Sequence, residues 1–168
     1  MKAVTNIIGI DPGLSGGICV LDPNGDIETL ITTPVIKMKT KKEHDTHAMS
    51  KIFRDQIVKG RYPAIFLETV HAHPKQGVVS MFNFGKGYGM WIGIAHALLF
   101  PLYHVRPQEW KKEMLKGTDK SKGAAIIKCK EMVPDINLKR TDRSKIDHDG
   151  MAEAYLIARF GYERIFGN

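Results

Sequence analysis

Residues 7–13 read Ile7-Ile8-Gly9-Ile10-Asp11-Pro12-Gly13. The apolar residues before Asp11 are typical of a strand buried on both faces, and Asp-Pro-Gly is turn chemistry that ends strand pairing. The sequence therefore predicts an acidic side chain at the end of a buried strand, with only the backbone of Gly13, Gly16 and Gly17 over it. Alone, such an aspartate most simply accepts hydrogen bonds from its own turn. Other acidic residues along the chain favour a functional role.

The composition indicates a basic protein of modest size. The chain has 168 residues, which predicts one domain over residues 1–168. Lys and Arg number 25 against 18 Asp and Glu, a formal charge of +7 that suits a polyanionic partner. Cys19 and Cys129 lie in apolar surroundings without metal-ligand spacing, so we expect reduced core thiols. No apolar run approaches the roughly 18 residues of a membrane span, and no signal peptide precedes the first strand, so we expect a cytoplasmic protein without membrane contact.

The order of predicted elements indicates an α/β protein. Three strands come first as an antiparallel meander, with a hairpin turn at Asp22–Asp26. Each of the two further strands follows a helix. The expected strands cover residues 7–10, 17–21, 27–33, 64–67 and 101–105, and the expected helices cover 47–59, 79–99, a short stretch from 107, 121–132 and a last helix from 149. Residues 37–42 form a basic connector, either a solvated loop or a contact for a phosphate backbone.

The long helix over residues 79–99 has two notable features. Small residues recur every four positions at Gly85, Gly89, Gly93 and Ala97, which lets another backbone approach closely. The sheet is the commoner partner for such a stripe, and a second subunit is the alternative. Aromatic residues fill the first half of the helix, and we expect most of them in the core, with one or two free to stack on exposed bases.

Three more acidic residues have placements like that of Asp11. Glu68 ends the apolar strand Ala64–Leu67, where burial is costly unless a cation or proton offsets the charge. Asp149 and Glu153 are four residues apart on the last helix and share one face, although Asp149 could instead be an N-cap and Glu153 merely exposed. Hard oxygen ligands without cysteine favour Mg²⁺ or Mn²⁺, and two such ions would suit phosphodiester hydrolysis. His71 and His73 lack a third ligand and argue weakly for zinc.

In order and spacing, these motifs resemble those of the RuvC Holliday junction resolvases, within the RNase H-like superfamily. The resemblance rests on Gly9-Ile10-Asp11-Pro12-Gly13, Leu67-Glu68-Thr69-Val70 and Asp149-Gly150-Met151-Ala152-Glu153-Ala154, and extends from Ile7 to about Gly161. It implies an RNase H-like fold, a five-stranded mixed sheet of three antiparallel and then two parallel strands flanked by helices. It also implies a homodimer that cuts a four-way DNA junction symmetrically, with Mg²⁺ as cofactor and 5′-phosphate products.

The resemblance assigns roles to particular residues. The metal ligands would be Asp11, Glu68, Asp149 and Glu153, with a share for Asp147 or His148 left open because the spacing of the last pair departs from the usual bacterial pattern. His71 lies where bacterial relatives carry a junction-opening Phe, so the imidazole or Phe82 would take that role, unless it is absent. Further DNA contacts would come from Lys75, Lys111, Lys112, Lys120 and Lys122. The departures favour a phage or divergent bacterial branch, in a bacterial or phage-infected cell.

Three other functions are considered. The glycine-rich turn also resembles the phosphate loop of actin-like ATPases, but those need two such domains and 168 residues cannot supply them. Cleavage of RNA–DNA hybrids by the same acids is a closer alternative. A non-catalytic nucleic-acid-binding protein is the third, although four acids on a basic chain would repel phosphates in the absence of metal.

Overall fold

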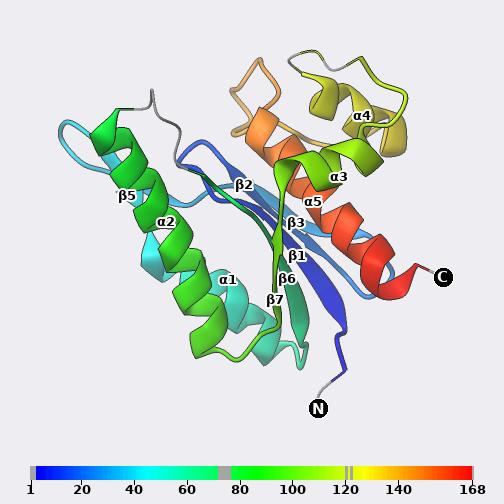
Figure 1. The fold of residues 1–168 in the computed structure, drawn as a ribbon, viewed down its shortest axis with the longest axis horizontal. Coiled ribbons are helices and arrows are strands. Elements are labelled where there is room, and N and C mark those ends of the chain that lie inside the picture. Colours follow the sequence, from blue (N-terminus) through cyan, green and yellow to red (C-terminus); the bar gives the residue numbers. More distant parts are fainter. Residues whose placement is uncertain (1–2, 72–76, 120, 122, 168) are drawn as a thin grey trace.

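A computed structural model describes residues 3–71, 77–119, 121 and 123–167, and a five-stranded mixed sheet forms its centre (Figure 1). In spatial order the strands are β3 (Ile27–Thr32), β2 (Gly17–Leu21), β1 (Asn6–Asp11), β6 (Pro63–Glu68) and β7 (Leu102–Val105). The pairs β1–β2 and β2–β3 are antiparallel, whereas β1–β6 and β6–β7 are parallel. The predicted RNase H-like sheet is therefore confirmed.

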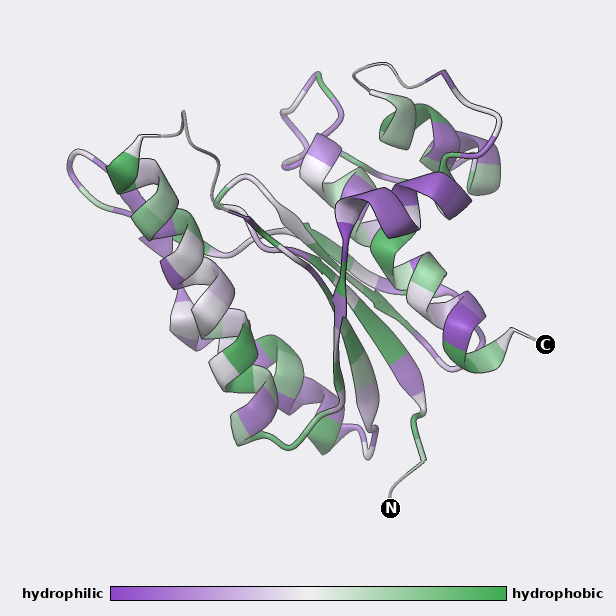
Figure 2. Ribbon diagram, viewed as in Figure 1, coloured by the Kyte–Doolittle hydropathy of each residue, from purple (hydrophilic) through white to green (hydrophobic). Residues whose placement is uncertain are grey.

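Helices cover both faces of the sheet (Figure 1). One face carries α1 (Thr46–Val58) and α2 (Val78–Ala97), and the other carries α3 (Pro107–Met114), α4 (Ala124–Met132) and α5 (Asp149–Phe166). Side chains alternate along β1, so that Ile7 joins the core under α5 while Ile8 and Ile10 join the core under α1 and α2. Both faces are buried, which explains the continuous apolar strands (Figure 2). Cys19 and Cys129 are buried free thiols in the α5-side core, as expected.

Among the helices within the described ranges, none is long and apolar enough to span a membrane.

Helix α5 lies against β1 and β2 at backbone contact distance. A Cβ added at Gly9 would be 2.2 Å from the Ala158 nitrogen, and one at Gly17 would be 2.5 Å from the Gly150 oxygen. A Cβ at Gly150 would in turn be 2.4 Å from the Ser15 oxygen. Contacts this short leave no room for a side chain, so glycine is required for the approach. The approach brings the first turns of α5 next to the carboxyl end of β1.

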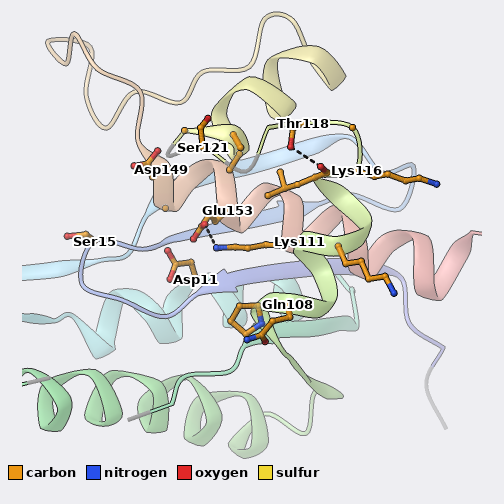
Figure 3. A pocket seen from close by; sticks show the side chains of 17 residues that line it. Asp11, Ser15, Gln108, Lys111, Lys116, Thr118, Ser121, Asp149 and Glu153 are labelled. Atoms are coloured by element: carbon orange, nitrogen blue, oxygen red, sulfur yellow. Dashed lines mark hydrogen bonds and ion pairs between the residues drawn. The ribbon is translucent and has the colours of Figure 1, made fainter. Parts of the chain in front are cut away.

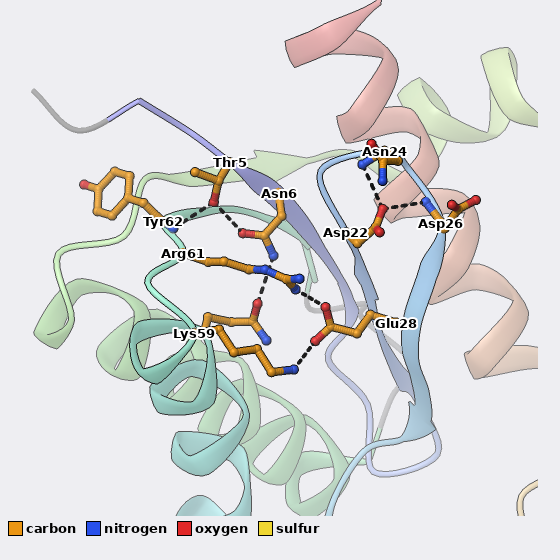
Figure 4. Close-up of polar contacts among 10 residues, drawn as sticks. Thr5, Asn6, Asp22, Asn24, Asp26, Glu28, Lys59, Arg61 and Tyr62 are labelled. Carbon is orange, nitrogen blue, oxygen red and sulfur yellow. Dashed lines mark hydrogen bonds and ion pairs between the residues drawn. The ribbon is translucent and has the colours of Figure 1, made fainter.

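Polar contacts hold the opposite end of the sheet (Figure 4). The Asn6 amide donates to Gln56 Oε1 at 3.0 Å, which satisfies a buried pair between β1 and α1. Glu28 on β3 forms ion pairs with both Lys59 and Arg61. The predicted turn after β2 is present, with Asp22 Oδ1 accepting hydrogen bonds from the backbone of Asn24 and Asp26.

Residues 37–42 differ from the predicted plain connector. They belong to a short antiparallel hairpin of β4 (Val35–Lys37) and β5 (Lys42–His44), closed by a hydrogen bond from Met38 N to Lys41 O of 2.8 Å. Three-residue strands rich in lysine lack the apolar alternation from which strands are recognised. Tertiary contacts of His44, the last residue of β5, support the pairing instead. Its side chain is buried between the Asp11–Pro12 turn and α2.

The small-residue stripe of α2 faces away from the sheet, contrary to the expectation that the sheet is its partner. Gly85, Gly89 and Gly93 are exposed, and a Cβ added at any of them would have nothing within 4 Å. The sheet instead receives the neighbouring row of Gly87, Trp91 and Ala95. That row carries the large indole of Trp91, which buries far more apolar area than glycines can.

The aromatic residues of α2 are also less buried than expected. Trp91 alone among Phe82, Phe84, Tyr88 and Trp91 is fully buried, and Phe82 is 71% exposed. The first turns of α2 therefore extend beyond the sheet that the rest of the helix covers.

We expect glycine-to-alanine substitutions to have opposite effects at Gly9 and Gly89. Gly9→Ala forces a Cβ into the backbone of α5 and should lower the free energy of unfolding by about 1–3 kcal/mol. Gly89→Ala, the matched control in an exposed helix interior, should raise it by up to about 1 kcal/mol. Urea denaturation of both variants measures the difference, and equal stabilities would contradict the close contact between α5 and β1.

Candidate active site

A pocket of about 1050 Å³ opens at the carboxyl end of β1. Its walls come from the β1–β2 turn, α3, the α3–α4 loop, α4 and the start of α5 (Figure 3). Asp11, Asp149 and Glu153 line it, so the structure brings three of the four predicted acidic residues to one pocket. The fourth, Glu68, ends the neighbouring parallel strand, in which Ile10 pairs with Leu67. Asp11 and Glu68 therefore leave the sheet at the same edge.

Three of these carboxylates interact electrostatically. Burial, followed by the negative charges of Glu68 and Glu153, raises the pKa of Asp11 from 3.8 to about 7. Burial also raises the pKa of Glu68, which is only 9% exposed, and the charge of Glu153 raises it further. Burial and mutual repulsion disfavour the full ionisation of these carboxylates, and this favours the binding of a cation or a proton.

Lys111 of α3 reaches into the acidic cluster (Figure 3). Its Nζ forms an ion pair of 2.7 Å with Glu153 Oε1. Burial by itself lowers the pKa of Lys111, but the hydrogen bond to Glu153 and the charges of Glu153, Glu68 and Asp11 outweigh burial and raise it. Lys111 thus partly neutralises the acidic cluster; its predicted contact with DNA stays a prediction.

Trp110 is a functional residue that the sequence analysis missed. Its indole is fully buried, and Nε1 donates a hydrogen bond of 2.8 Å to Glu68 Oε1. This bond favours the ionised carboxylate and lowers the pKa of Glu68 against the effect of burial. A buried tryptophan usually needs a hydrogen-bond acceptor for its N–H. The sequence could therefore have indicated that Trp110 has a polar partner, but it could not have identified Glu68 as that partner.

Asp149 lies further out than the other three acids. It is the exposed first residue of α5, one helical turn before the half-buried Glu153. Within the described part of the chain, no three His, Cys, Asp or Glu side chains come close enough together to hold a metal ion as a group. Ligation of an ion by Asp11, Glu68, Asp149 and Glu153 therefore stays a prediction.

The residues before Asp149 have structural partners of their own. His148, and not Asp149, is the N-cap of α5, and its Nδ1 accepts a hydrogen bond from Met151 N at 3.3 Å. Asp147 forms an ion pair with Lys130. Neither Asp147 nor His148 lines the pocket, so their share in the site has no geometric support.

The predicted DNA-binding residues are spread over two places. Lys112 is exposed and lines the same pocket as Lys111. His71 and Phe82 line a second, smaller groove of about 450 Å³ at the first turns of α2. Lys75, Lys120 and Lys122 lie outside the described residues.

No protein-family model and no curated protein matches the chain by sequence. Solved structures do match its fold. The RuvC of Thermus thermophilus in complex with a Holliday junction substrate aligns over 92% of this chain and 90% of its own, with a TM-score of 0.55 and 13% identity. The fold is that of the RuvC resolvases.

Two further structures support the RuvC-like fold. A second Thermus thermophilus RuvC structure aligns over 95% of each chain at 16% identity with a TM-score of 0.55. The yeast mitochondrial Holliday junction resolvase Ydc2 aligns over 94% of this chain and 78% of its own, at 15% identity with a TM-score of 0.56. The RuvC resemblance drawn from the sequence is thus confirmed for the fold. The assignment to a phage or divergent bacterial branch stays a prediction.

The raised pKa of Asp11 predicts a pH-dependent stability. Between pH 3.8 and about 7 the folded chain binds more protons at Asp11 than the unfolded chain does, so the free energy of unfolding falls as pH rises through this range. The slope is at most about 1.4 kcal/mol per pH unit. Asp11→Asn should flatten the profile measured by urea denaturation from pH 4 to pH 8, whereas Asp142→Asn, at an exposed aspartate, should keep it. Parallel profiles for wild type and Asp11→Asn would contradict the buried cluster.

The hydrogen bond from Trp110 to Glu68 can be isolated with a matched pair of variants. Trp110 and Trp91 are both fully buried, but within the described residues Trp91 Nε1 has no hydrogen-bond partner. Trp110→Phe should therefore cost about 1.5–3 kcal/mol more than Trp91→Phe at pH 8, because a higher pH favours the ionised carboxylate that accepts this bond. The difference should shrink at pH 4. Equal costs at pH 8 would show that the indole N–H does not support the carboxylate.

Proposed function

We propose that this chain is a metal-dependent endonuclease that resolves four-way DNA junctions. The observation that carries the proposal is the cluster of Asp11, Glu68 and Glu153 on one edge of a RuvC-like sheet. A structure with the same fold was solved with a Holliday junction substrate, which supports branched DNA as the ligand here. The basic composition suits a polyanion of this kind.

The donor set fits a hard divalent cation. Asp11 and Glu68 offer buried carboxylate oxygens and Glu153 a half-buried carboxylate, and a cation would relieve their mutual repulsion. Asp149 lies one turn before Glu153 on the same helix face. Mg²⁺ would be held by these residues, with Mn²⁺ able to substitute, and we propose two ions per site. When bound, the ions would lower the pKa of an attacking water and stabilise the charge on the phosphate.

The chain's own residues would prepare the site for the phosphate. The hydrogen bond from Trp110 orients the Glu68 carboxylate and favours its ionised form against the effect of burial. Lys111 offsets the acidic charge through its ion pair with Glu153, and its Nζ could contact a substrate phosphate at the same pocket. Lys112 and Lys116 line the same pocket and can contact the neighbouring backbone phosphates. Attack by water on the phosphorus, with the 3′ oxygen leaving, would produce the proposed 5′-phosphate ends.

We also propose that two copies work together, because symmetric resolution needs one site for each of two strands. The exposed row of Gly85, Gly89, Gly93 and Ala97 on α2 is the candidate contact, since small residues let two helices approach closely. Apolar side chains at the start of α2, Val78 and Val79, are also exposed. The expected setting is the cytoplasm of a bacterial or phage-infected cell.

The test is cleavage of a labelled synthetic four-way junction with Mg²⁺, beside a linear duplex and an RNA–DNA hybrid. Wild type should introduce paired symmetric nicks with 5′-phosphate ends into the junction only. Asp149→Asn and Asp11→Asn should each reduce the rate by about 100-fold or more while junction binding persists, since several kcal/mol of charge stabilisation is lost. Asp147→Asn, two residues away but outside the pocket, should cleave at close to the wild-type rate.

Other outcomes would replace the proposal. Cleavage of the hybrid in place of the junction would retain the metal site and assign an RNase H-type activity. Junction binding that is insensitive to Mg²⁺, without cleavage in Mg²⁺ or Mn²⁺, would indicate a non-catalytic DNA-binding protein of the same fold.

A further inference from the structure

The β4–β5 hairpin, residues 35–44, is a strongly basic surface that the active site does not use. Its loop and strands carry Lys37, Lys39, Lys41 and Lys42, all exposed. The one acidic residue of the hairpin, Glu43, already forms an ion pair with Lys41, with 2.6 Å between Lys41 Nζ and Glu43 Oε1. Within the described residues, no carboxylate forms an ion pair with Lys37, Lys39 or Lys42. We call residues 35–44 the basic hairpin.

The register of the basic hairpin places like charges side by side. Lys37 pairs directly with Lys42 across the two strands. Like charges directly opposite each other destabilise a strand pair. Lys86, an exposed residue of α2, adds a further positive charge close enough to lower the pKa of Glu43, after the larger effects of the Lys41 hydrogen bond and charge. A polyanion lying on this surface would relieve the repulsion.

The base of the basic hairpin is fixed to the turn that carries Asp11. His44 is buried, and its Nε2–H donates to the Pro12 oxygen at 3.2 Å. On its other side the imidazole fills the space that a side chain at Gly87 of α2 would need, since a Cβ there would be 2.1 Å from the ring. Asp45 N also donates to the Pro34 oxygen at 3.0 Å. The lysines are therefore carried on a base in direct contact with the residue after Asp11.

The basic hairpin and α3 lie on opposite sides of the carboxyl end of β1. Figure 1 places the hairpin beside the first turns of α2, and places α3, α4 and the start of α5 on the other side of the β1–β2 turn. Lys111, Lys112 and Lys116 line the pocket on that second side. A nucleic-acid backbone that passes over Asp11 can thus meet lysines on both sides of the site.

We propose that the basic hairpin binds the phosphate backbone of a duplex DNA arm, on the side of the active site away from α3. The proposal rests on the proposed function and deepens it by naming where an arm of the substrate lies. Duplex DNA is favoured over other polyanions because the hairpin is attached to the turn of a candidate DNA-cleaving site. The lysines give such binding a salt dependence that can be measured.

The test compares junction affinity over a range of salt concentrations with Ca²⁺ in place of Mg²⁺, so that oxygen ligands are satisfied while DNA stays uncut. Each lysine–phosphate contact contributes about 0.9 to the slope of log affinity against log salt. The double variant Lys39→Gln/Lys42→Gln should reduce the magnitude of this negative slope by about 1.8, and Lys39→Gln alone should reduce it by about 0.9. The control Lys51→Gln/Arg159→Gln removes the same charge at exposed ion pairs on α1 and α5 and should leave the slope unchanged.

Each result decides the question. The hairpin variant should unfold at or above the wild-type temperature, because the Lys37–Lys42 repulsion is removed. A wild-type slope in both hairpin variants would overturn the proposal while leaving the resolvase function in place. Failure of wild type to bind any DNA would overturn both. Loss of binding to phosphatidylserine vesicles in the hairpin variant, with an unchanged DNA slope, would overturn the proposal in favour of a membrane contact.

Discussion

The approach of α5 to β1 and β2 is the constraint on which the rest of the site depends. Gly9, Gly17 and Gly150 let a helix and two strands meet at backbone distance, where side chains would hold them apart. Because of this approach, Glu153 lines the same pocket as Asp11, and its charge helps to raise the pKa of Asp11. Asp149, one turn earlier on α5, lines that pocket too. The same contact buries most of α5, so that the stability of the core and the geometry of the acidic cluster have one origin.

The acidic cluster carries more negative than positive side chains, which favours the binding of a cation. Three carboxylates face one lysine, and burial raises the pKa of Asp11 to about 7. Trp110 acts in the opposite sense at Glu68, because its N–H stabilises the charged form. A protein interior normally avoids uncompensated charge, and carboxylates with strongly shifted pKa values are typical of catalytic or ligand-binding sites. The exposed Lys112 and Lys116 line the same pocket.

Apart from Lys111, which is ion-paired within the acidic cluster, exposed lysines of the described residues lie on both sides of it. On one side they come from α3 and on the other from the basic hairpin, and both are attached directly to elements that hold the carboxylates: Trp110 of α3 bonds Glu68, and His44 of the hairpin bonds Pro12. Both basic segments are therefore joined to the elements around the acidic cluster by buried hydrogen bonds. The outward glycine row of α2 is exposed, and a Cβ added at Gly85, Gly89 or Gly93 would have nothing within 4 Å.

Sequence alone located the five strands of the central sheet along the chain and placed Asp11 and Glu68 at strand ends, because buried strands, turns and helices have local residue patterns. It also placed Asp149 and Glu153 on one helix face, since helical spacing is local too. Only the tertiary structure decided that Lys111 lies among the acids, that Trp110 supports Glu68, that residues 37–42 belong to a hairpin, and which row of α2 meets the sheet. These outcomes depend on residues far apart in the chain competing for the same buried space. That competition is settled by backbone distance and buried area, which no local pattern encodes.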